Sequence, residues 1–535
     1  MDDDLPTEYD VIVVGTGLVE SVLAAAASRI GKKVLHIDGN SYYGQQWATF
    51  SLDYFELWLD KISNSNKGVT SKDVVNDLLQ SERQYYVTNK DELSVSNAKW
   101  EWYLLNEVDN SCQVENASVG SETTKKDEGE VWTRDAVKKL TQKFNIDLSP
   151  KILFSKGPMV ELLIRSGVSR YTEFVSVHNV LLYLNSAIES VPYSKSDVFS
   201  TRTVSVVEKR ILMKLLQEIQ NFNHDSLEKE QNKNETFSEF LKKFQIPDNI
   251  EKYILYSIAR VSEKSPCSEG IKAAQIFLNS LGVYGNSPFL WPLYGSSELV
   301  QAFCRLCAVY GGIYCLNRGA EKIIVESNKC IGVLSDNKEL FAEHVVMSSS
   351  QAPMEFYLAS NSLLIISRGI LITDKTLYSS GKRGASMLQF PSEDSTLPPI
   401  TIIELDNSAL ACPAGLCLVH LIKKGPDDGY EEFDKILKEL FEEPCESQKP
   451  ILSKNNEELA VEPRKPCVLF KLYFSISQIS SEPSEMKPTN FYSCTGPVQF
   501  ELDFFSALQE AEKIFRQMFP DEEFLPMPVE TTSEE

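Results

Sequence analysis

The most regular hydrophobic pattern in the chain lies near its N-terminus. Tyr9 to Val14 holds four consecutive β-branched residues, which is typical of a short strand buried on both faces. A glycine-containing turn follows, then an Ala-rich stretch with helical character from Ser21 to Ile30, and then a second strand from Lys33 to Asp38. This order predicts a parallel pair of strands joined by a right-handed crossover.

The pattern changes in the middle of the chain. The stretch from about 60 to 130 is polar with weak periodicity, and we interpret it as a loop or disordered insert. Helical periodicity then dominates. The expected helices are 133–145, 157–168, 206–221, 236–245 and 248–262, with Pro247 separating the last two. Residues 131–284 are therefore predicted to form a mainly helical domain.

Strand signals return from Pro288 onward. The expected strands are 312–316, 322–326, 330–335, 343–347, 363–372, 401–405, 416–421 and 468–474, and residues 506–518 are expected to form a closing helix. Two N-terminal strands are too few for a stable sheet, so both ends of the chain are expected to share one. The predicted fold class is α/β. Residues 1–130 and 285–520 would form one discontinuous domain, with the helical domain inserted and an acidic tail at 521–535.

The length and net charge of the chain limit the classes of protein to which it can belong. A chain of 535 residues exceeds the roughly 250–300 residues that one core supports, which agrees with two domains. The net charge of −23 argues against nucleic-acid binding, because a polyanion would be repelled. No apolar stretch approaches the ~20 residues needed to span a bilayer, and the acidic start does not resemble a secretory leader. We therefore expect a cytosolic protein.

The eleven cysteines follow no regular spacing, and in a reducing cytosol most are expected to be free and buried. Cys304 and Cys307 have the CxxC spacing of a metal site, but no second pair of ligands lies nearby in the sequence. We therefore predict no metal. The last residues carry no prenylation box, so the chain is not expected to be lipid-anchored itself.

The turn after the first strand is similar to a dinucleotide-binding turn with one position changed. Gly15 and Gly17 would allow close approach of a pyrophosphate, and Asp38 ends the second strand, where an acid binds ribose hydroxyls. The third glycine position holds Glu20, whose carboxylate can satisfy the helix N-terminus and would repel a pyrophosphate. Pro497 stands where a second cofactor contact would need an acid. The sequence thus predicts a dinucleotide-type fold without its cofactor.

Several blocks of the sequence resemble the superfamily of Rab GDP-dissociation inhibitors and Rab escort proteins. They are Asp10–Leu18, Lys33–Asp38, Tyr42–Gly44, Phe144–Leu148, Val168–Tyr171, Tyr284–Gly295 and the segment from Glu298 through Tyr314. The resemblance implies a flavoprotein-like fold without flavin, and a platform that binds Rab GTPases in their GDP form. It assigns the platform to Tyr43, Glu298, Arg305, Tyr314 and Cys315. A tyrosine beside charges of both signs is suited to a GTPase switch surface.

The two branches of this superfamily differ in what the helical domain does. Inhibitors extract prenylated Rabs from membranes, whereas escort proteins also dock a prenyltransferase through a Phe and an Arg. Phe199 and Arg210, eleven residues apart, match this pair, and the long polar insert suits the larger escort branch. The resemblance therefore implies a non-catalytic escort protein that presents Rab to Rab geranylgeranyltransferase, through the α subunit of that enzyme. It would then shelter the geranylgeranyl lipid and contact membranes transiently during delivery.

Two other functions stay open on the sequence alone. A Rab GDP-dissociation inhibitor would explain the platform but not the Phe–Arg pair. A flavin-dependent oxidoreductase would explain the fold but not the carboxylate in the glycine turn. The chain also departs from the superfamily pattern in two loops. Gln45 and Gln46 stand where a second glycine is usual, and Ser296 and Ser297 replace a step richer in glycine.

Overall fold

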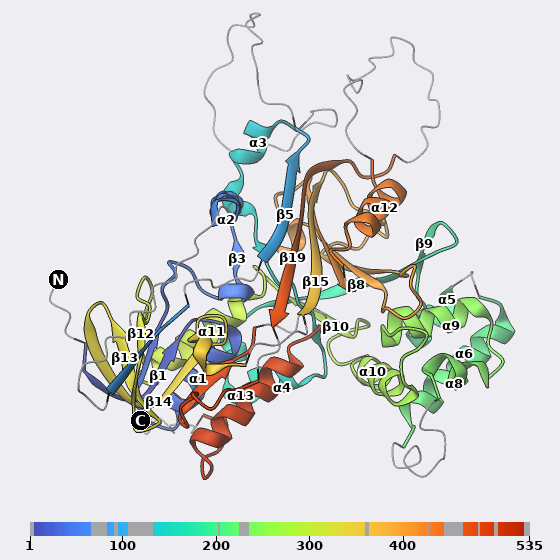
Figure 1. The fold of residues 1–535 in the computed structure, drawn as a ribbon. Helices are drawn as coiled ribbons and strands as arrows, with labels where there is room; N and C mark the ends of the chain where they lie inside the picture. The colour runs from blue at the N-terminus through green and yellow to red at the C-terminus, as the bar shows by residue number, and fades with distance from the viewer. Residues whose placement is uncertain are drawn as a thin grey trace, which may run out of the picture.

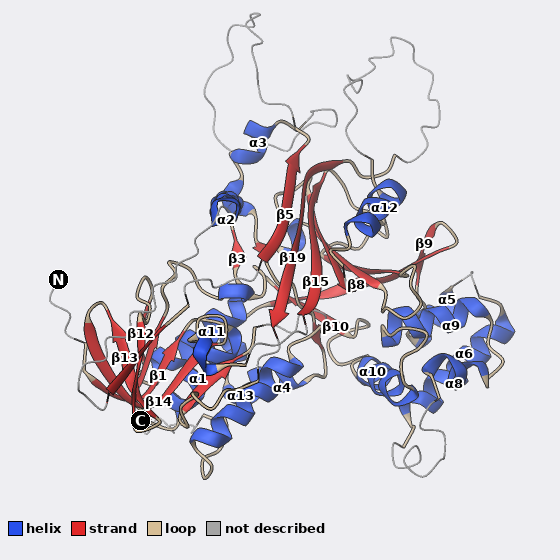
Figure 2. Cartoon of the chain, viewed as in Figure 1, coloured by secondary structure: helices blue, strands red, loops and turns tan. Residues whose placement is uncertain are grey.

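The structure is a computed structural model, and it describes residues 5–65, 83–89, 95–104, 132–201, 204–223, 235–358, 363–425, 427–442, 464–479, 482–496 and 501–528. Two large β-sheets and a cluster of helices make up most of this part of the chain, as Figure 1 shows by residue number and Figure 2 by element type. The smaller sheet combines strands from both ends of the chain. The prediction of a shared sheet is therefore confirmed.

The smaller sheet has eight strands. Its order is β11 (Ile313–Cys315), β2 (Val34–Ile37), β1 (Glu8–Val14), β14 (Lys338–Ser348), β13 (Lys329–Ser335), β12 (Lys322–Glu326) and β4 (Arg83–Val87), with β20 (Phe491–Cys494) beside β14. β1 runs parallel to β2 and β14. Val11 and Val13 share a core with α1 (Leu18–Arg29), α11 (Ser297–Val309) and α13 (Phe505–Met518), whereas Ile12 and Val14 belong to a second core. Burial on both faces explains the unbroken β-branched run.

The larger sheet has ten strands and is mostly antiparallel. Its order is β5 (Val95–Trp102), β19 (Val468–Ile479), β15 (Leu363–Thr373), β18 (Cys417–Gly425), β17 (Ile400–Leu405), β16 (Ala385–Phe390), β8 (Phe174–Leu184), β10 (Phe289–Pro292) and β7 (Leu153–Phe154), with β9 (Ala187–Ser190) beside β8. α12 (Tyr430–Leu440) packs on one face, and α2 (Leu52–Ser65) packs on the other.

Short elements connect these layers. They are η1 (Gln45–Trp47), α3 (Arg134–Lys138), η2 (Thr141–Lys143), α4 (Pro158–Ser166), η3 (Val168–Tyr171), η5 (Met354–Phe356), η6 (Asn407–Ala409), and the two-stranded ribbon of β3 (Thr49–Phe50) and β6 (Ile146–Asp147). None of the described helices is long and apolar enough to cross a bilayer.

A cluster of helices lies to one side of the larger sheet (Figure 1). It contains α5 (Lys195–Ser200), α6 (Val206–Gln220), α8 (Phe237–Lys242), α9 (Asp248–Lys252), the π-helix η4 (Tyr253–Ala259) and α10 (Cys267–Asn279). Three of these helices begin with a capping box, in which Ser194, Ser205 or Thr236 accepts a hydrogen bond from the backbone amide three residues later. The acidic side chain of that later residue in turn accepts a hydrogen bond from the backbone amide of the capping residue. These caps explain where the helices start.

The helical part starts later than the predicted boundary at residue 131. β8 and β9 lie inside that segment, yet they belong to the larger sheet, because β8 pairs with β16 and β10. The second half of β8, Val180–Leu184, is an unbroken apolar run, so periodicity does not distinguish it from a helix. The expected helix 133–145 is α3 followed by η2, and 248–262 is α9 followed by η4.

The stretch 60–130, expected to be a loop or disordered, contains two strands. β4 pairs with β12 and β5 pairs with β19, each at the edge of a sheet. Most of their side chains are exposed or half-buried, so backbone pairing rather than a core defines these strands. Residues 66–82, 90–94 and 105–131 lie outside the described residues.

The C-terminal segment, expected to be an acidic tail, packs on the molecule as far as residue 528. Phe524 and Leu525 are buried in the core that α1 and α13 share. Arg29 also donates a hydrogen bond from Nη2 to the Pro526 carbonyl, at 3.0 Å. Two buried apolar side chains and one hydrogen bond thus hold part of a segment whose charge pattern alone indicates a solvated tail. Residues 529–535 lie outside the described residues.

Candidate functional site

The glycine turn between β1 and α1 is filled by side chains of the chain itself. Gly15 has a φ of +103°, which permits the tight turn, but the Gln45 amide lies so close that a Cβ atom on Gly15 would overlap it. The Glu20 carboxyl folds back over Gly17 in the same way. The space in which a pyrophosphate would meet the backbone is therefore occupied.

The acid expected to bind ribose is already hydrogen-bonded. The Thr16 amide and hydroxyl donate to Asp38 Oδ2 at 2.7 and 2.5 Å, and the Asn40 amide donates to Oδ1 at 2.9 Å. Burial raises the pKa of Asp38, and the Thr16 and Asn40 hydrogen bonds lower it. Gln46 lies against Gly496 at the second cofactor contact, while Pro497 lies outside the described residues.

The charge at Glu20 differs from the expectation. Burial raises the pKa of its carboxyl to about 8, and a hydrogen bond with its own backbone only partly offsets this. At neutral pH the group is therefore mostly protonated, so it blocks the turn by its volume rather than by repulsion. The residues present do not fit a dinucleotide, because Glu20, Gln45 and the bonded Asp38 occupy the turn where it would bind.

The side chains of the CxxC pair, Cys304 and Cys307, contact serine hydroxyls of α1. Cys304 Sγ lies 3.4 Å from the Ser21 hydroxyl, and Cys307 Sγ lies 3.1 Å from the Ser28 hydroxyl. Burial raises the pKa of Cys304 to about 12 and that of Cys307 to about 11, so both are thiols at neutral pH. Among the described residues, no group of three His, Cys, Asp or Glu could hold a metal ion.

The five predicted platform residues lie on α11, on β11 of the smaller sheet and, for Tyr43, in the loop before η1. The Tyr43 and Tyr314 rings are 6.1 Å apart between centroids, and burial followed by a hydrogen bond to Tyr314 raises the pKa of Tyr43. Tyr314 is on β11, where it is 37% exposed, and Cys315 follows it, half-buried. The structure thus brings Tyr43 together with the tyrosine of β11.

Glu298 and Arg305 are on α11, which packs against α1 and η3. Glu298 is half-buried, and burial raises the pKa of its carboxyl. Arg305 is exposed, and its guanidinium lies 4.4 Å from the centre of the Tyr171 ring in η3. Such stacking holds the charged end of Arg305 in place while leaving its hydrogen-bond donors accessible.

The predicted transferase-binding pair lies on the helical part. Phe199, at the end of α5, is 74% exposed, which is unusual for a phenylalanine and argues against a core role. Arg210 is exposed on α6. Lys209 ties the two helices together, because its Nζ donates to the carbonyls of Phe199 at 3.0 Å and Thr201 at 2.6 Å. The pair therefore lies on adjacent helices.

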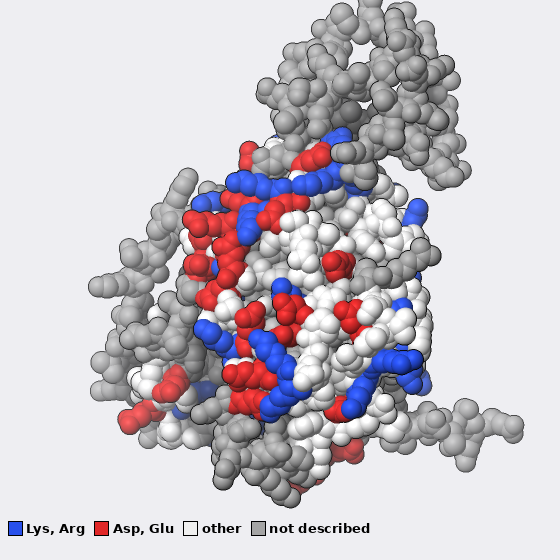
Figure 3. Space-filling model, turned by 90° about the vertical axis from the view of Figure 1, so that its right-hand side faces the viewer, with Lys and Arg blue, Asp and Glu red and all other residues white. Residues whose placement is uncertain are grey.

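Two further exposed apolar residues accompany this pair. Val206 and Val207, in the first turn of α6, are 68% and 65% exposed. They lie four and three residues before Arg210, which places them near it on the helix. The sequence signal is that they are out of phase with the buried positions of α6, which are Leu212, Leu215, Leu216 and Ile219. Figure 3 shows charges of both signs interspersed with uncharged areas over the side of the molecule on which the helical part lies.

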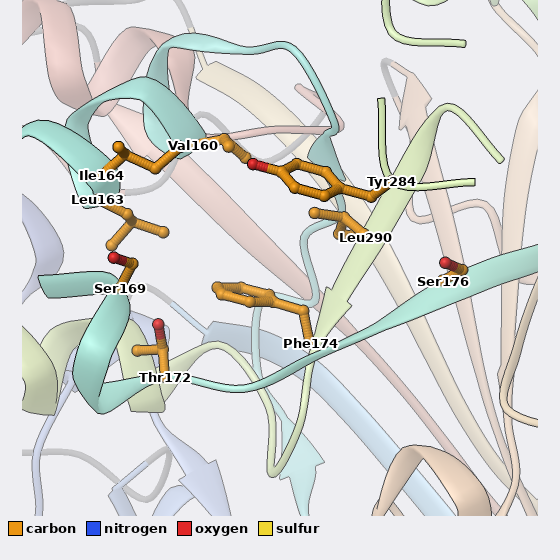
Figure 4. Close-up of a pocket in the computed structure, with 9 residues that line it drawn as sticks. All are labelled: Val160, Leu163, Ile164, Ser169, Thr172, Phe174, Ser176, Tyr284 and Leu290. Atoms are coloured by element: carbon orange, nitrogen blue, oxygen red, sulfur yellow. The ribbon is translucent and has the colours of Figure 1, made fainter. Parts of the chain in front are cut away.

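An apolar cavity of about 350 Å³ lies between α4, η3, β8 and β10. Figure 4 shows its lining, which is Val160, Leu163, Ile164, Ser169, Thr172, Phe174, Ser176, Tyr284 and Leu290. Ile164 and Tyr284 are about half exposed, so the cavity opens to solvent. It adjoins the η3 segment on which Arg305 stacks. Its residues come from four elements and the loops beside them, so no local sequence pattern indicates it.

A family model described as GDP dissociation inhibitor matches residues 1–87 and 123–382, which is well over half of the chain. The chain belongs to the Rab GDP-dissociation inhibitor and Rab escort protein family. A second model, described as the C-terminal region of RAE1/2 domain I, matches residues 366–499 of this family member. The match confirms the resemblance that the sequence blocks indicated.

Relatives that match over nearly the whole chain come from several organisms. The chain is 32% identical to Rab proteins geranylgeranyltransferase component A 1 of Rattus norvegicus, over 99% of this chain and 93% of that protein. It is 35% identical to Rab proteins geranylgeranyltransferase component A of Drosophila melanogaster, over 98% and 91%. It is 25% identical to Rab escort protein 1 of Arabidopsis thaliana, over 99% and 96%. The similarity therefore spans nearly the whole chain.

The fold is shared with solved structures of low sequence identity. The crystal structure of Rab GDI from Plasmodium falciparum superposes with a TM-score of 0.63 at 17% identity, covering 97% of this chain and all of that one. An oxidoreductase from Methanosarcina mazei gives a TM-score of 0.51 at 11% identity, over 95% and 100%. These likenesses confirm the predicted flavoprotein-like fold class of this family member. The roles of its platform and helical-part residues stay predictions.

Proposed function

We propose that this chain is a Rab escort protein. It binds newly made, GDP-bound Rab GTPases, presents them to Rab geranylgeranyltransferase and delivers the prenylated Rab to membranes, without making bonds itself. The observation that carries the proposal is that Phe199 and Arg210 are both exposed on the adjacent helices α5 and α6, which are different elements from the platform of α11 and β11. An aromatic anchor with a guanidinium is typical of an interface hot spot. Two such surfaces allow one chain to hold two proteins at once.

The platform is proposed to bind the switch regions of Rab. Tyr43, Tyr314 and Cys315 would contact apolar parts of the switch surface, and Glu298 and Arg305 would pair with its charges. The Arg305 guanidinium is already held over Tyr171, so little conformational entropy is lost when it binds. This supports Arg305 as the strongest single contributor of the five.

The apolar cavity is proposed to receive the flexible C-terminal segment of Rab. It opens beside η3, and η3 also contacts α11 of the platform. If Rab is bound to α11, its C-terminal segment would therefore contact the apolar lining of the cavity before it reaches the helical part. The helical part would then shelter the attached geranylgeranyl lipid. At about 0.8 kcal/mol per buried CH₂, even partial shelter of the lipid is worth several kcal/mol.

A Rab GDP-dissociation inhibitor is the second candidate, and the names of the relatives that match over nearly the whole chain favour the escort branch over it. The exposed Phe199 has no role in that alternative. An oxidoreductase is disfavoured by the filled glycine turn. The escort role implies a cytosolic protein with transient membrane contact, acting as the accessory component of the transferase through its α subunit.

Charge reversal at the platform tests Rab binding. Arg305→Glu should weaken the affinity for GDP-loaded Rab at least about tenfold, because a hot-spot arginine would become a repelling charge. Lys435→Glu makes the same charge change on α12, which covers the larger sheet, and should leave Rab affinity unchanged. Fluorescence titration with Rab would measure both variants. Equal affinities for wild type and Arg305→Glu would mean that the platform is misplaced.

A further inference from the structure

The N-terminus of α11 is held by two side chains from a distant part of the chain. The Ser296 amide donates to Asp147 Oδ1 at 2.9 Å, and the Ser297 amide donates to Thr49 Oγ1 at 3.1 Å. The Thr49 hydroxyl in turn donates to Asp147 Oδ1. Ser296 makes no side-chain cap of its own. The first backbone amides of the helix, which have no partner within it, are thus satisfied from outside.

The two capping residues are themselves placed by the ribbon of β3 and β6. Thr49 and Asp147 are direct register partners in this antiparallel pair. The loop before α11 is shaped to meet them, since Gly295 has a φ of +97° and a Cβ atom there would lie 2.7 Å from both Asp147 Oδ1 and Thr49 Oγ1. A side chain at Gly295 would therefore separate the helix from its caps.

This arrangement connects segments that carry different platform residues. Tyr43 precedes Thr49 by six residues, with η1 between them, while Glu298 and Arg305 follow the capped amides on α11. The cap therefore connects the segment that carries Tyr43 with the helix that carries Glu298 and Arg305. Asp147 is fully buried, and Arg368 in β15, also fully buried, acts on it electrostatically from the larger sheet. The Asp147 carboxyl is therefore enclosed, whereas Thr49 is half-buried.

We infer that Thr49 and Asp147 are positioning residues for Rab binding, which set α11 relative to Tyr43 and so fix the spacing of the platform. The inference rests on the proposed escort function. Neither residue needs to touch Rab, because both act through the first turn of α11. A cap that served only stability would affect every activity of the protein equally. A positioning cap affects Rab binding and spares the transferase surface on α5 and α6.

The test compares two substitutions at one position, of which one has the shape of threonine without its hydroxyl and the other keeps the hydroxyl without the methyl group. Thr49→Val removes the hydroxyl and with it both hydrogen bonds, whereas Thr49→Ser keeps them. Thr49→Val should weaken the affinity for GDP-loaded Rab about fivefold to tenfold, on the scale of a lost helix cap. Thr49→Ser should stay within about twofold of wild type, and both variants should bind transferase as wild type does. Affinities for both partners would be measured on the full chain by titration.

Asp147→Asn is the second variant. The amide oxygen can still accept from Ser296 and Thr49, so Rab affinity should be kept, while the melting temperature falls because the charge opposite Arg368 is lost. Rab affinity equal to wild type in Thr49→Val, equal loss of both partners, or loss of Rab binding in folded Asp147→Asn would each overturn the inference. Failure of the wild-type protein to bind Rab would instead overturn the escort function, and the inference with it.

Discussion

At the scale of single residues, the side chains of Glu20 and Gln45 fill the glycine turn between β1 and α1, although its backbone has the shape of a dinucleotide-binding turn. Glu20 was identifiable from the sequence as a misfit in the glycine pattern, and so were Gln45 and Gln46 as departures from the superfamily. What the sequence could not reveal is that the Gln45 amide folds onto Gly15 and that Glu20 is buried enough to take up a proton. Both facts depend on tertiary packing, which local patterns do not encode.

The buried carboxyl of Glu20 predicts a dependence of stability on pH. Its pKa rises from about 4.5 unfolded to about 8 folded because of burial. Between these values the folded protein holds a proton that the unfolded chain has released, so the free energy of unfolding falls as pH rises. Glu20→Gln cannot ionise and should therefore gain stability relative to wild type between pH 5 and pH 8. Denaturant unfolding at several pH values measures this, and parallel profiles would contradict it.

At the scale of elements, the sequence was most informative where burial alone defines a strand or helix. β1, β2, β12 and α13 were predicted from apolar runs or helical periodicity, and the structure confirms them. β4 and β5 were missed, because edge strands depend on a partner strand for their definition. The Phe–Arg pair was predicted from the resemblance to escort proteins, whereas the exposure of Val206 and Val207 was not predicted, since exposure is a property of packing.

The α5–α6 surface carries the next prediction. Phe199→Ala should lower the affinity for Rab geranylgeranyltransferase about thirtyfold or more, as for a central hot-spot aromatic, and leave Rab affinity unchanged. Val207→Ser should give a smaller loss in the same direction. Ile276→Ala is a matched control, because Ile276 is also an exposed apolar residue of the helical part, on α10. Surface plasmon resonance with immobilised transferase would measure all three. Equal affinities of Phe199→Ala and wild type for the transferase would contradict the assignment of α5 and α6 as its docking surface.

At the scale of the whole molecule, the proposed partner surfaces lie on different parts of the chain, and the cavity beside η3 adjoins the platform. The shared sheet was predictable because two N-terminal strands are too few for a stable sheet, and most of the helical part was predictable from its periodicity. The cavity was not, because its lining comes from residues between 160 and 290 on four elements.

The cavity predicts a dependence on the Rab C-terminal segment. Ile164→Glu places a charge at its half-exposed mouth, where folding should tolerate it. This variant should bind full-length GDP-loaded Rab several-fold more weakly than wild type, since apolar contacts would be replaced by a solvated carboxylate. It should bind a Rab that lacks the C-terminal segment as wild type does. An equal loss of affinity for both forms of Rab would contradict the proposal that the cavity binds the C-terminal segment.

The most direct test of the escort account is reconstituted prenylation with purified components. GDP-loaded Rab, Rab geranylgeranyltransferase and a geranylgeranyl donor would be combined with and without this chain, and lipid incorporation into Rab would be followed by mass spectrometry. The account predicts incorporation when chain and transferase are both present, a large loss with Phe199→Ala or Arg305→Glu, and none with the chain alone. Incorporation by the chain without transferase, or no stimulation of the transferase by the chain, would contradict it.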